Sequence, residues 1–442
     1  MDMKELQKIM QESGVVGAGG AGFPTYAKLT DKAETILLNC AECEPLLKLH
    51  RQLLEKHAYE IMKTFWLVAE TVGAKEAVIG IKKSYVQTVK ALQQHIEEFP
   101  AMRIHLLEEV YPMGDEVVLI YEATGRVVRP GGLPIEQGVA VFNVETIYNV
   151  YHAVEKQKPV TDKYVSVVAE VKNPVTVRVP LGCTLEEVVA QAGEITVKDP
   201  VYFVGGPMMG RIGNPSDPVT KTTNAILVLP KDHLIVMKKN RTSSIDLKRA
   251  ASICCQCNTC TDLCPRNNLG HPIDPARFMR AAANNDFQDL NPYLDAAFCS
   301  SCGVCEMYAC PQSLAPRTLL ADMKGGLRKA GIRPPQGVQP KAVQESREYR
   351  KVPEERLMAR LGLTKYDKDA PMDENLVGVP KVKILLSQHI GAPAQALVKA
   401  GDEVTRGQMI AKPADGLSVG IHASICGKVT EVTDRHIIIA AK

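Results

Sequence analysis

Two cysteine-rich runs carry the clearest chemistry in the sequence. Residues 254–265, CCQCNTCTDLCP, contain four cysteines at the spacing of the bacterial ferredoxin run and end in proline. Residues 299–311, CSSCGVCEMYACP, repeat the pattern with one extra residue before the last cysteine. The eight thiolates are those of Cys254, Cys257, Cys260, Cys264, Cys299, Cys302, Cys305 and Cys310. They predict two [4Fe-4S] clusters, because each such cluster takes four thiolates.

The fourth cysteine of each run is expected to cross to the other cluster, as in two-cluster ferredoxins. One cluster would then be held by Cys254, Cys257, Cys260 and Cys310, and the other by Cys299, Cys302, Cys305 and Cys264. Structural zinc is the alternative, since paired CxxC motifs also bind zinc. Zinc sites, however, do not call for a third cysteine and a Cys-Pro step in each run.

The segment between the runs, HPIDPARFMRAAANNDFQDL, has proline where a first helical turn accepts it and apolar residues at helical spacing. It predicts a helical two-cluster ferredoxin domain over residues 236–330. Such clusters transfer single electrons and do not take up hydride. The electrons must therefore come from another part of the chain or from a partner.

A glycine-rich loop near the N-terminus is the second chemical feature. Residues 14–28, GVVGAGGAGFPTYAK, hold five glycines within nine positions. Glycine lets backbone N–H groups approach an anion closely, which is how phosphate loops work. The segments ETILLNCAECEP and AVIGI predict strands that alternate with helices. Residues 1–160 are therefore expected to form a Rossmann-like α/β domain with a phosphate-binding loop.

The remaining segments change in character along the chain. Residues 161–235 predict two alternating strands and a capped helix, which favours a β-grasp domain. This domain could contact a ligand or partner, or act as a rigid spacer. Residues 331–378 are rich in proline and charge and predict a linker with one charged helix. Residues 379–442 predict short strands separated by glycine turns. The fold class is thus multidomain, α/β plus β.

Composition narrows the class of function. The chain has 442 residues, with 53 basic and 50 acidic side chains and a formal charge of +3. No basic block suited to nucleic acid is present. No segment resembles a secretory signal or reaches the ~20 apolar residues of a membrane span. Thirteen cysteines, mostly at metal-ligand spacing, indicate a reducing compartment, so a cytoplasmic location is expected.

Four short motifs carry a resemblance to a known family. GAGGAGFPT, NCAECEP, YPMGDE and FNVET resemble the flavin domain of the NADH-oxidising subunit of complex I, of Rnf complex C subunits and of PduS-type cobalamin reductases. The last two also share the tandem cysteine runs. The last 64 residues resemble the barrel-sandwich domain of biotinyl and lipoyl carriers, and residues 161–235 resemble the soluble-ligand-binding β-grasp domain. Because the small all-β domain follows the flavin domain instead of preceding it, the order favours the PduS type.

This resemblance implies FMN and two [4Fe-4S] clusters as cofactors, with NADH as substrate. It implies that Gly17, Gly19, Gly20 and Lys28 hold the phosphate side of FMN, and that Asn39, Glu42 and Asn143 contact the rest of the flavin. Phe23 would stack on the nicotinamide, and Glu44 and Glu116 would hydrogen-bond NADH. The alternative is that Glu42 and Glu44 lie in an exposed turn and that Phe23 is a core aromatic residue. No catalytic side chain is assigned, because the cofactors carry the chemistry.

The resemblance implies electron transfer from NADH through FMN and the clusters to cobalamin, in support of a diol dehydratase. An Rnf-like or amino-acid-reductase-associated carrier with a protein acceptor is the alternative, and a scaffold with structural clusters is a third. Expected partners are cobalamin or a cobalamin-handling protein, and a redox partner or microcompartment shell protein. The protein would then act in the cytoplasm, either free or inside a bacterial microcompartment.

Overall fold

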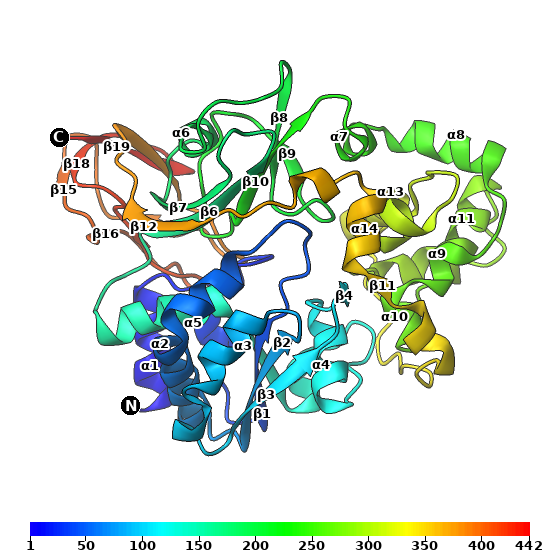
Figure 1. Ribbon diagram of the computed structural model, residues 1–442, viewed down its shortest axis with the longest axis horizontal. Coiled ribbons are helices and arrows are strands. Elements are labelled where there is room, and N and C mark those ends of the chain that lie inside the picture. The colour runs from blue at the N-terminus through cyan, green and yellow to red at the C-terminus, as the bar shows by residue number, and fades with distance from the viewer.

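The computed structural model describes residues 1–442, which form four bodies around a central junction (Figure 1). An α/β body lies at the bottom of the view, with a strand-rich body above it. A helical body lies to the right, and the C-terminal strands lie at the upper left. None of the helices combines the length and the apolar character that crossing a membrane requires.

The N-terminal body is built on a four-stranded sheet in the order β3-β2-β1-β5. Its strands are β1 (Thr35–Cys40), β2 (Glu76–Lys82), β3 (Met102–Leu107) and β5 (Val139–Asn143). All neighbours are parallel, so their carboxyl ends share one edge, and Asn39 lies beside Asn143 there. The predicted alternation of strands and helices is confirmed.

Helices cover both faces of this sheet. They are α1 (Met3–Glu12), α2 (Leu49–Val72), α3 (Val86–Gln93), α4 (Glu116–Thr124) and α5 (Val144–Glu155). Ile36 and Leu38 of β1 pack in one apolar cluster with α1, α2 and α5, whereas Leu37 packs in another with α4. Burial on both faces explains why β1 reads as a continuous apolar run.

The second body, called the β-grasp body below, is a six-stranded sheet in the order β12-β7-β6-β10-β8-β9. Its strands are β6 (Asp162–Ala169), β7 (Val175–Pro180), β8 (Pro200–Val204), β9 (Arg211–Gly213), β10 (Ala225–Pro230) and β12 (Met372–Leu376). Strands β6 and β7 form the predicted hairpin, and β6 pairs in parallel with β10. Helix α6 (Leu185–Ala190) begins with the predicted capping box between Thr184 and Glu187.

The third body is helical and carries both cysteine runs. Its helices are α7 (Leu234–Lys239), α8 (Ser243–Ile253), α9 (Thr259–Asp262), α10 (Pro265–Asn268), α11 (Pro275–Ala283), α12 (Asn291–Leu294) and α13 (Pro316–Lys329). Pro275 occupies the first turn of α11, and Phe278 and Met279 are buried, as the sequence predicts. The helices share one apolar cluster that includes Cys264 and, at its edge, Cys310.

Residues 331–378 do more than link two bodies. They contain the predicted charged helix, α14 (Glu354–Arg360), together with strand β11 (Val352–Pro353) and β12. Strand β11 pairs with β4 (Val110–Tyr111) of the N-terminal body, and β12 pairs in parallel with β7. The linker expectation is corrected in this respect, because short strands bound only by backbone hydrogen bonds leave little pattern in the sequence. The four domain boundaries remain a proposal.

The C-terminal body consists of two small sheets that face each other. One has the order β13-β19-β18-β15, and the other has the order β14-β16-β17. The strands are β13 (Lys381–Leu385), β14 (Gln395–Ala396), β15 (Glu403–Val404), β16 (Met409–Lys412), β17 (Ile421–His422), β18 (Gly427–Val432) and β19 (His436–Ala441). Their inward residues form a single apolar cluster.

A buried ion pair between Lys163 and Glu145 joins β6 to α5, and both side chains are at most 2% exposed. Replacing Lys163 with Met should lower the free energy of unfolding by about 3–5 kcal/mol, because Glu145 would be left buried without a counter-charge. Adding Glu145→Leu should recover most of the loss. Urea denaturation of the single and double variants measures this. Equal stability of Lys163→Met and the wild type would contradict the prediction.

Candidate functional site

The glycine loop, residues 14–23, forms one wall of a large cavity above the sheet edge. Gly20 has a φ of 84°, which glycine adopts without strain, and a side chain there would meet no atom within 4 Å. A Cβ on Gly19 would come within 3.3 Å of the Asn143 amide nitrogen. The absence of side chains therefore leaves the loop backbone accessible from the cavity.

The cavity has a volume of about 1470 Å³ and brings together every residue that the sequence assigned to FMN or NADH. These residues are Gly17, Gly19, Gly20, Phe23, Lys28, Asn39, Glu42, Glu44, Glu116 and Asn143. They come from the glycine loop, the ends of β1 and β5, and the start of α4. The parallel sheet gathers them because its strands end at the same edge.

The two asparagines at this edge are held by the backbone around them. The Asn39 amide donates to the Gly114 carbonyl at 3.0 Å. The Asn143 side-chain oxygen caps α5 by accepting from the Glu145 and Thr146 N–H groups. These contacts fix both amides at the floor of the cavity before any ligand binds.

Glu42 is buried, with 7% exposure, and its carboxylate accepts from the backbone N–H of His50 at 3.1 Å. It therefore satisfies a donor in the first turn of α2. The His50 ring in turn lies 3.2 Å from the Asn143 amide nitrogen, measured to Nε2. The alternative of an exposed turn at Glu42 does not describe this structure.

Glu44 lies on the cavity wall, but both carboxylate oxygens are already engaged. They accept from the N–H groups of Met208 at 2.8 Å and Met209 at 3.0 Å. Burial raises the pKa of Glu44 to about 7, although these N–H groups and the Lys239 ammonium favour its charged form. Its predicted role toward NADH remains a prediction, and its observed contact is with the β8–β9 loop.

Lys28, Glu116 and Phe23 line the same cavity. The Lys28 ammonium donates to the Val141 carbonyl at 2.8 Å and lies 3.7 Å from the Glu116 carboxylate. Phe23 is half-buried, so one part of its ring is packed and another part remains available on the wall. An aromatic surface in this position is suited to stacking on a planar ligand.

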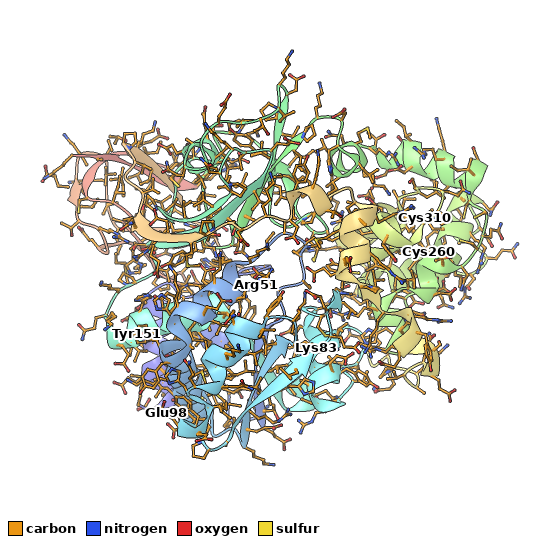
Figure 2. The ribbon with its side chains drawn as sticks, in the orientation of Figure 1. Arg51, Lys83, Glu98, Tyr151, Cys260 and Cys310 are labelled. Atoms are coloured by element: carbon orange, nitrogen blue, oxygen red, sulfur yellow. The ribbon has the colours of Figure 1, made fainter.

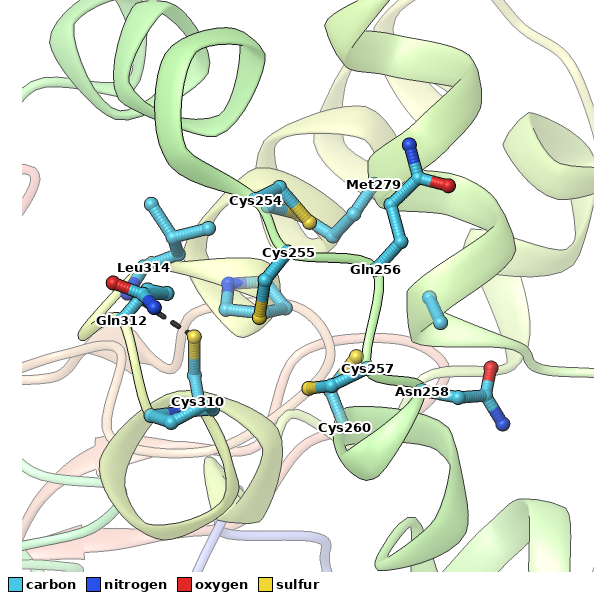
Figure 3. Close-up of a pocket in the computed structure, with 13 residues that line it drawn as sticks. Cys254, Cys255, Gln256, Cys257, Asn258, Cys260, Met279, Cys310, Gln312 and Leu314 are labelled. Carbon is cyan, nitrogen blue, oxygen red and sulfur yellow. Dashed lines mark hydrogen bonds between the residues drawn. The ribbon is translucent and has the colours of Figure 1, made fainter.

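The first cysteine pocket has a volume of about 400 Å³ and lies in the helical body (Figures 2 and 3). Its walls include the thiols of Cys254, Cys257, Cys260 and Cys310. Cys310 therefore joins the first run, and its Sγ accepts from the Leu314 N–H at 3.3 Å, the dashed line in Figure 3. Burial and the neighbouring thiols raise the pKa of Cys260 to about 12. A positively charged metal centre would offset this shift.

The second cysteine pocket, of about 330 Å³, is lined by Cys264, Cys299, Cys302 and Cys305. The fourth cysteine of each run thus lies with the first three of the other run. No three His, Cys, Asp or Glu side chains converge closely enough to hold a single metal ion. Instead, each set of four thiols surrounds a volume that suits a multi-atom cluster.

The second cysteine pocket adjoins the large cavity. Ser300 and Cys302 line both of them. The Tyr111 hydroxyl, on the cavity wall, donates to the Cys302 carbonyl at 2.6 Å. The first cysteine pocket shares no lining residue with the cavity. The large cavity, the second pocket and the first pocket therefore follow one another in that order.

Several cavity residues were missed because they come from other bodies or from distant parts of the chain. They are His50, Tyr111, Met209, Asn224, Ser300 and Cys302. The polar run Lys221–Asn224 before the apolar strand β10 is the only signal in the sequence that points to Asn224. Contacts between distant segments leave no local pattern that could reveal the others.

Three family models match successive parts of the chain. The Nuo51 FMN-binding domain matches residues 10–152, the 4Fe-4S dicluster domain matches residues 253–315, and the RnfC barrel sandwich hybrid domain matches residues 366–442. The predicted fold class is thereby confirmed, and the chain has an FMN-binding domain and a 4Fe-4S domain. The crystal structure of an NAD⁺-reducing [NiFe]-hydrogenase in the H₂-reduced state has a similar fold. Its TM-score is 0.52 at 21% identity, covering 76% of this chain and 64% of that one.

Relatives extend over the whole chain. Cobalamin reductase PduS of Salmonella typhimurium is 42% identical over 98% of this chain and 96% of its own length. The PduS of Citrobacter freundii is 40% identical over 99% and 97%. One component of the Na⁺-translocating ferredoxin:NAD⁺ oxidoreductase complex of Acetobacterium woodii is 31% identical over 60% and 58%. The full-length matches therefore show that this chain belongs to the PduS family of cobalamin reductases.

Proposed function

We propose that this chain uses FMN to oxidise NADH and passes the electrons one at a time through two [4Fe-4S] clusters to cobalamin. One observation carries the proposal. The residues assigned to FMN and NADH surround a single cavity, and Cys302 lies both on its wall and in a cysteine pocket. Hydride chemistry and one-electron chemistry thus have adjoining sites in one chain. The names of the PduS relatives support cobalamin as the acceptor.

The residues of the cavity fit the flavin. Gly17, Gly19, Gly20 and Lys28 would hold the phosphate side, because open backbone N–H groups and an ammonium suit an anion. Asn39, Glu42 and Asn143 would contact the rest of FMN. When bound, FMN supplies the exchange between two-electron and one-electron transfer, and the clusters carry single electrons.

The residues proposed for NADH lie on the same cavity. Phe23 offers its ring for stacking on the nicotinamide. Glu116 is partly exposed and paired only with Lys28, so its carboxylate can accept from NADH hydroxyl groups. Glu44 could do so only after leaving its two backbone donors. Glu116 is therefore the better supported of the two.

We infer an order for the two clusters. The cluster held by Cys264, Cys299, Cys302 and Cys305 would receive electrons first, because its pocket adjoins the cavity. The cluster held by Cys254, Cys257, Cys260 and Cys310 would follow. Cys257 is exposed, so this second cluster would lie near the surface, where an acceptor can approach.

A protein acceptor is the second candidate. The accessible position of Cys257 suits a docked redox protein as well as a corrinoid. The Rnf relative is named as part of an oxidoreductase complex. For location and partners, we propose the cytoplasm, free or within a microcompartment with its shell or redox proteins. The thirteen unpaired cysteines support a reducing compartment.

Replacing Gly19 with Val should abolish FMN retention while both clusters assemble. Even a Cβ there would lie 3.3 Å from Asn143 and 3.4 Å from Asn224, so the larger side chain must fill the flavin cradle. Flavin content of the anaerobically purified protein is the measurement. Gly378→Val is the matched control, because a Cβ at Gly378 meets nothing within 4 Å. Full flavin content in Gly19→Val would show that the loop does not bind the phosphate.

Replacing Cys310 or Cys264 with Ser should each remove one cluster and reduce the iron content from about eight to about four per chain. NADH should still bleach the remaining cluster of Cys310→Ser but not that of Cys264→Ser, although dithionite should reduce both. Cys255→Ser is the control, since Cys255 lies at the first pocket without being an assigned ligand. NADH-driven reduction of the remaining cluster in Cys264→Ser would reverse the proposed order.

Anaerobic protein with NADH should convert cob(III)alamin to its reduced forms, followed by UV–visible spectra. Cys310→Ser should lose most of this activity and keep NADH-dependent reduction of ferricyanide, because ferricyanide can take electrons from the flavin. Cobalamin reduction by Cys310→Ser at the wild-type rate would mean that electrons leave before the last cluster. Reduction of a ferredoxin-type protein without cobalamin reduction would favour the second candidate.

A further inference from the structure

An asparagine from the β-grasp body reaches the flavin cavity. Asn224 lies just before β10 and lines the cavity opposite the sheet edge. Its side-chain oxygen is buried and receives no hydrogen bond. Its amide nitrogen would lie 3.4 Å from a Cβ on Gly19, so the side chain stands directly over the glycine loop. A buried acceptor without a donor is costly unless a ligand supplies one.

The chemistry of FMN limits what this oxygen can face. The phosphate offers mainly acceptors near neutral pH, so it cannot satisfy another acceptor. The ribityl hydroxyls and the imide N–H of the isoalloxazine ring are donors. Asn224 is therefore matched to the ribityl chain or the ring, and the glycine loop below it remains matched to the phosphate.

The loop that carries Asn224 is fastened by a buried lysine. Lys221 is 2% exposed, and its ammonium donates to the Gly14 carbonyl at 2.7 Å and the Gly420 carbonyl at 3.2 Å. No carboxylate pairs with it, and burial lowers its pKa to about 7. One side chain thus joins the β-grasp body, the glycine loop and the C-terminal body.

The C-terminal body holds the same glycine loop at further points. Gly420 N–H donates to the Gln11 carbonyl at 2.9 Å, and Ile390 N–H donates to the Gly22 carbonyl at 3.3 Å. The Tyr26 hydroxyl donates to the Gly416 carbonyl at 3.3 Å. Both ends of the loop are therefore in contact with the C-terminal strands, although none of these strands lines the cavity.

We propose that Asn224 is a further flavin-contacting residue, and that Lys221 is a positioning residue that holds its loop and the glycine loop together against the C-terminal body. The C-terminal body thus acts as an internal clamp on the flavin site. This inference rests on FMN binding as proposed above. It adds a residue and a role for the last body that the flavin-domain motifs do not include.

The test for Asn224 compares FMN affinity with stability. Asn224→Leu keeps the volume of the side chain and removes its polar atoms. FMN should bind about five- to tenfold more weakly, as measured by quenching of flavin fluorescence on titration. The melting temperature of the FMN-free protein should stay equal or rise, because an unpaired buried acceptor has been removed. Asn214→Ala, on an exposed turn of the same body, is the control and should change neither quantity.

Two results would overturn this part of the inference. FMN affinity in Asn224→Leu equal to the wild type would show that the amide does not contact the flavin. A lower melting temperature of the FMN-free variant, in step with the lost affinity, would assign Asn224 a purely structural role. A wild-type protein that binds no FMN would instead refute the proposed function itself, so the two failures are distinct.

The test for Lys221 uses hydrogen exchange and FMN affinity together. Lys221→Met should speed amide exchange in residues 14–26 and weaken FMN binding several-fold, although Lys221 does not line the cavity. Lys231→Met, at an exposed lysine, should change neither. Tyr26→Phe removes one hydroxyl from the same clamp and serves if Lys221→Met does not fold. Unchanged exchange and unchanged affinity in the variant that folds would overturn the clamp.

Discussion

The hydrogen bond from the Tyr111 hydroxyl to the Cys302 carbonyl is the contact on which the arrangement depends. It is 2.6 Å long and buried, and it joins the flavin cavity to the loop of the adjoining cysteine pocket. Electron transfer through protein slows steeply with distance, so a flavin and its first cluster must stay close. A buried hydroxyl bonded to backbone costs free energy if it is pulled apart, which keeps the two bodies in one register.

The β8–β9 loop is wedged between the same two bodies. Glu44 binds the N–H groups of Met208 and Met209, while the Lys239 ammonium binds the carbonyls of Met208 and Gly210. Met208 is fully buried, in one apolar cluster with residues of all three bodies. The β-grasp body thus separates flavin and clusters by a fixed amount, which agrees with a spacer role. Met209 is exposed and lines the cavity, so only one of the two methionines fills a core.

Local patterns predicted much of this molecule, and long-range contacts account for what they missed. The cysteine spacing predicted eight thiols that lie around two pockets, and the glycine loop and strand ends predicted residues that share one cavity. Thr184 and Glu187 predicted their helix start. Asn224 and Lys221 could not be found in this way, since their partners lie about 200 residues away in the chain. Strands β11 and β12 escaped because backbone pairing across domains does not depend on residue type.

The place of β12 in the β-grasp sheet has a consequence for biosynthesis. Strand β12 pairs with β7 but follows it by almost 200 residues, and the whole helical body is made in between. On the ribosome, β7 therefore emerges as an unpaired edge and stays so until the chain is nearly complete. Such edges template wrong pairings, so a nascent chain of this family depends on chaperone cover or fast synthesis during that interval.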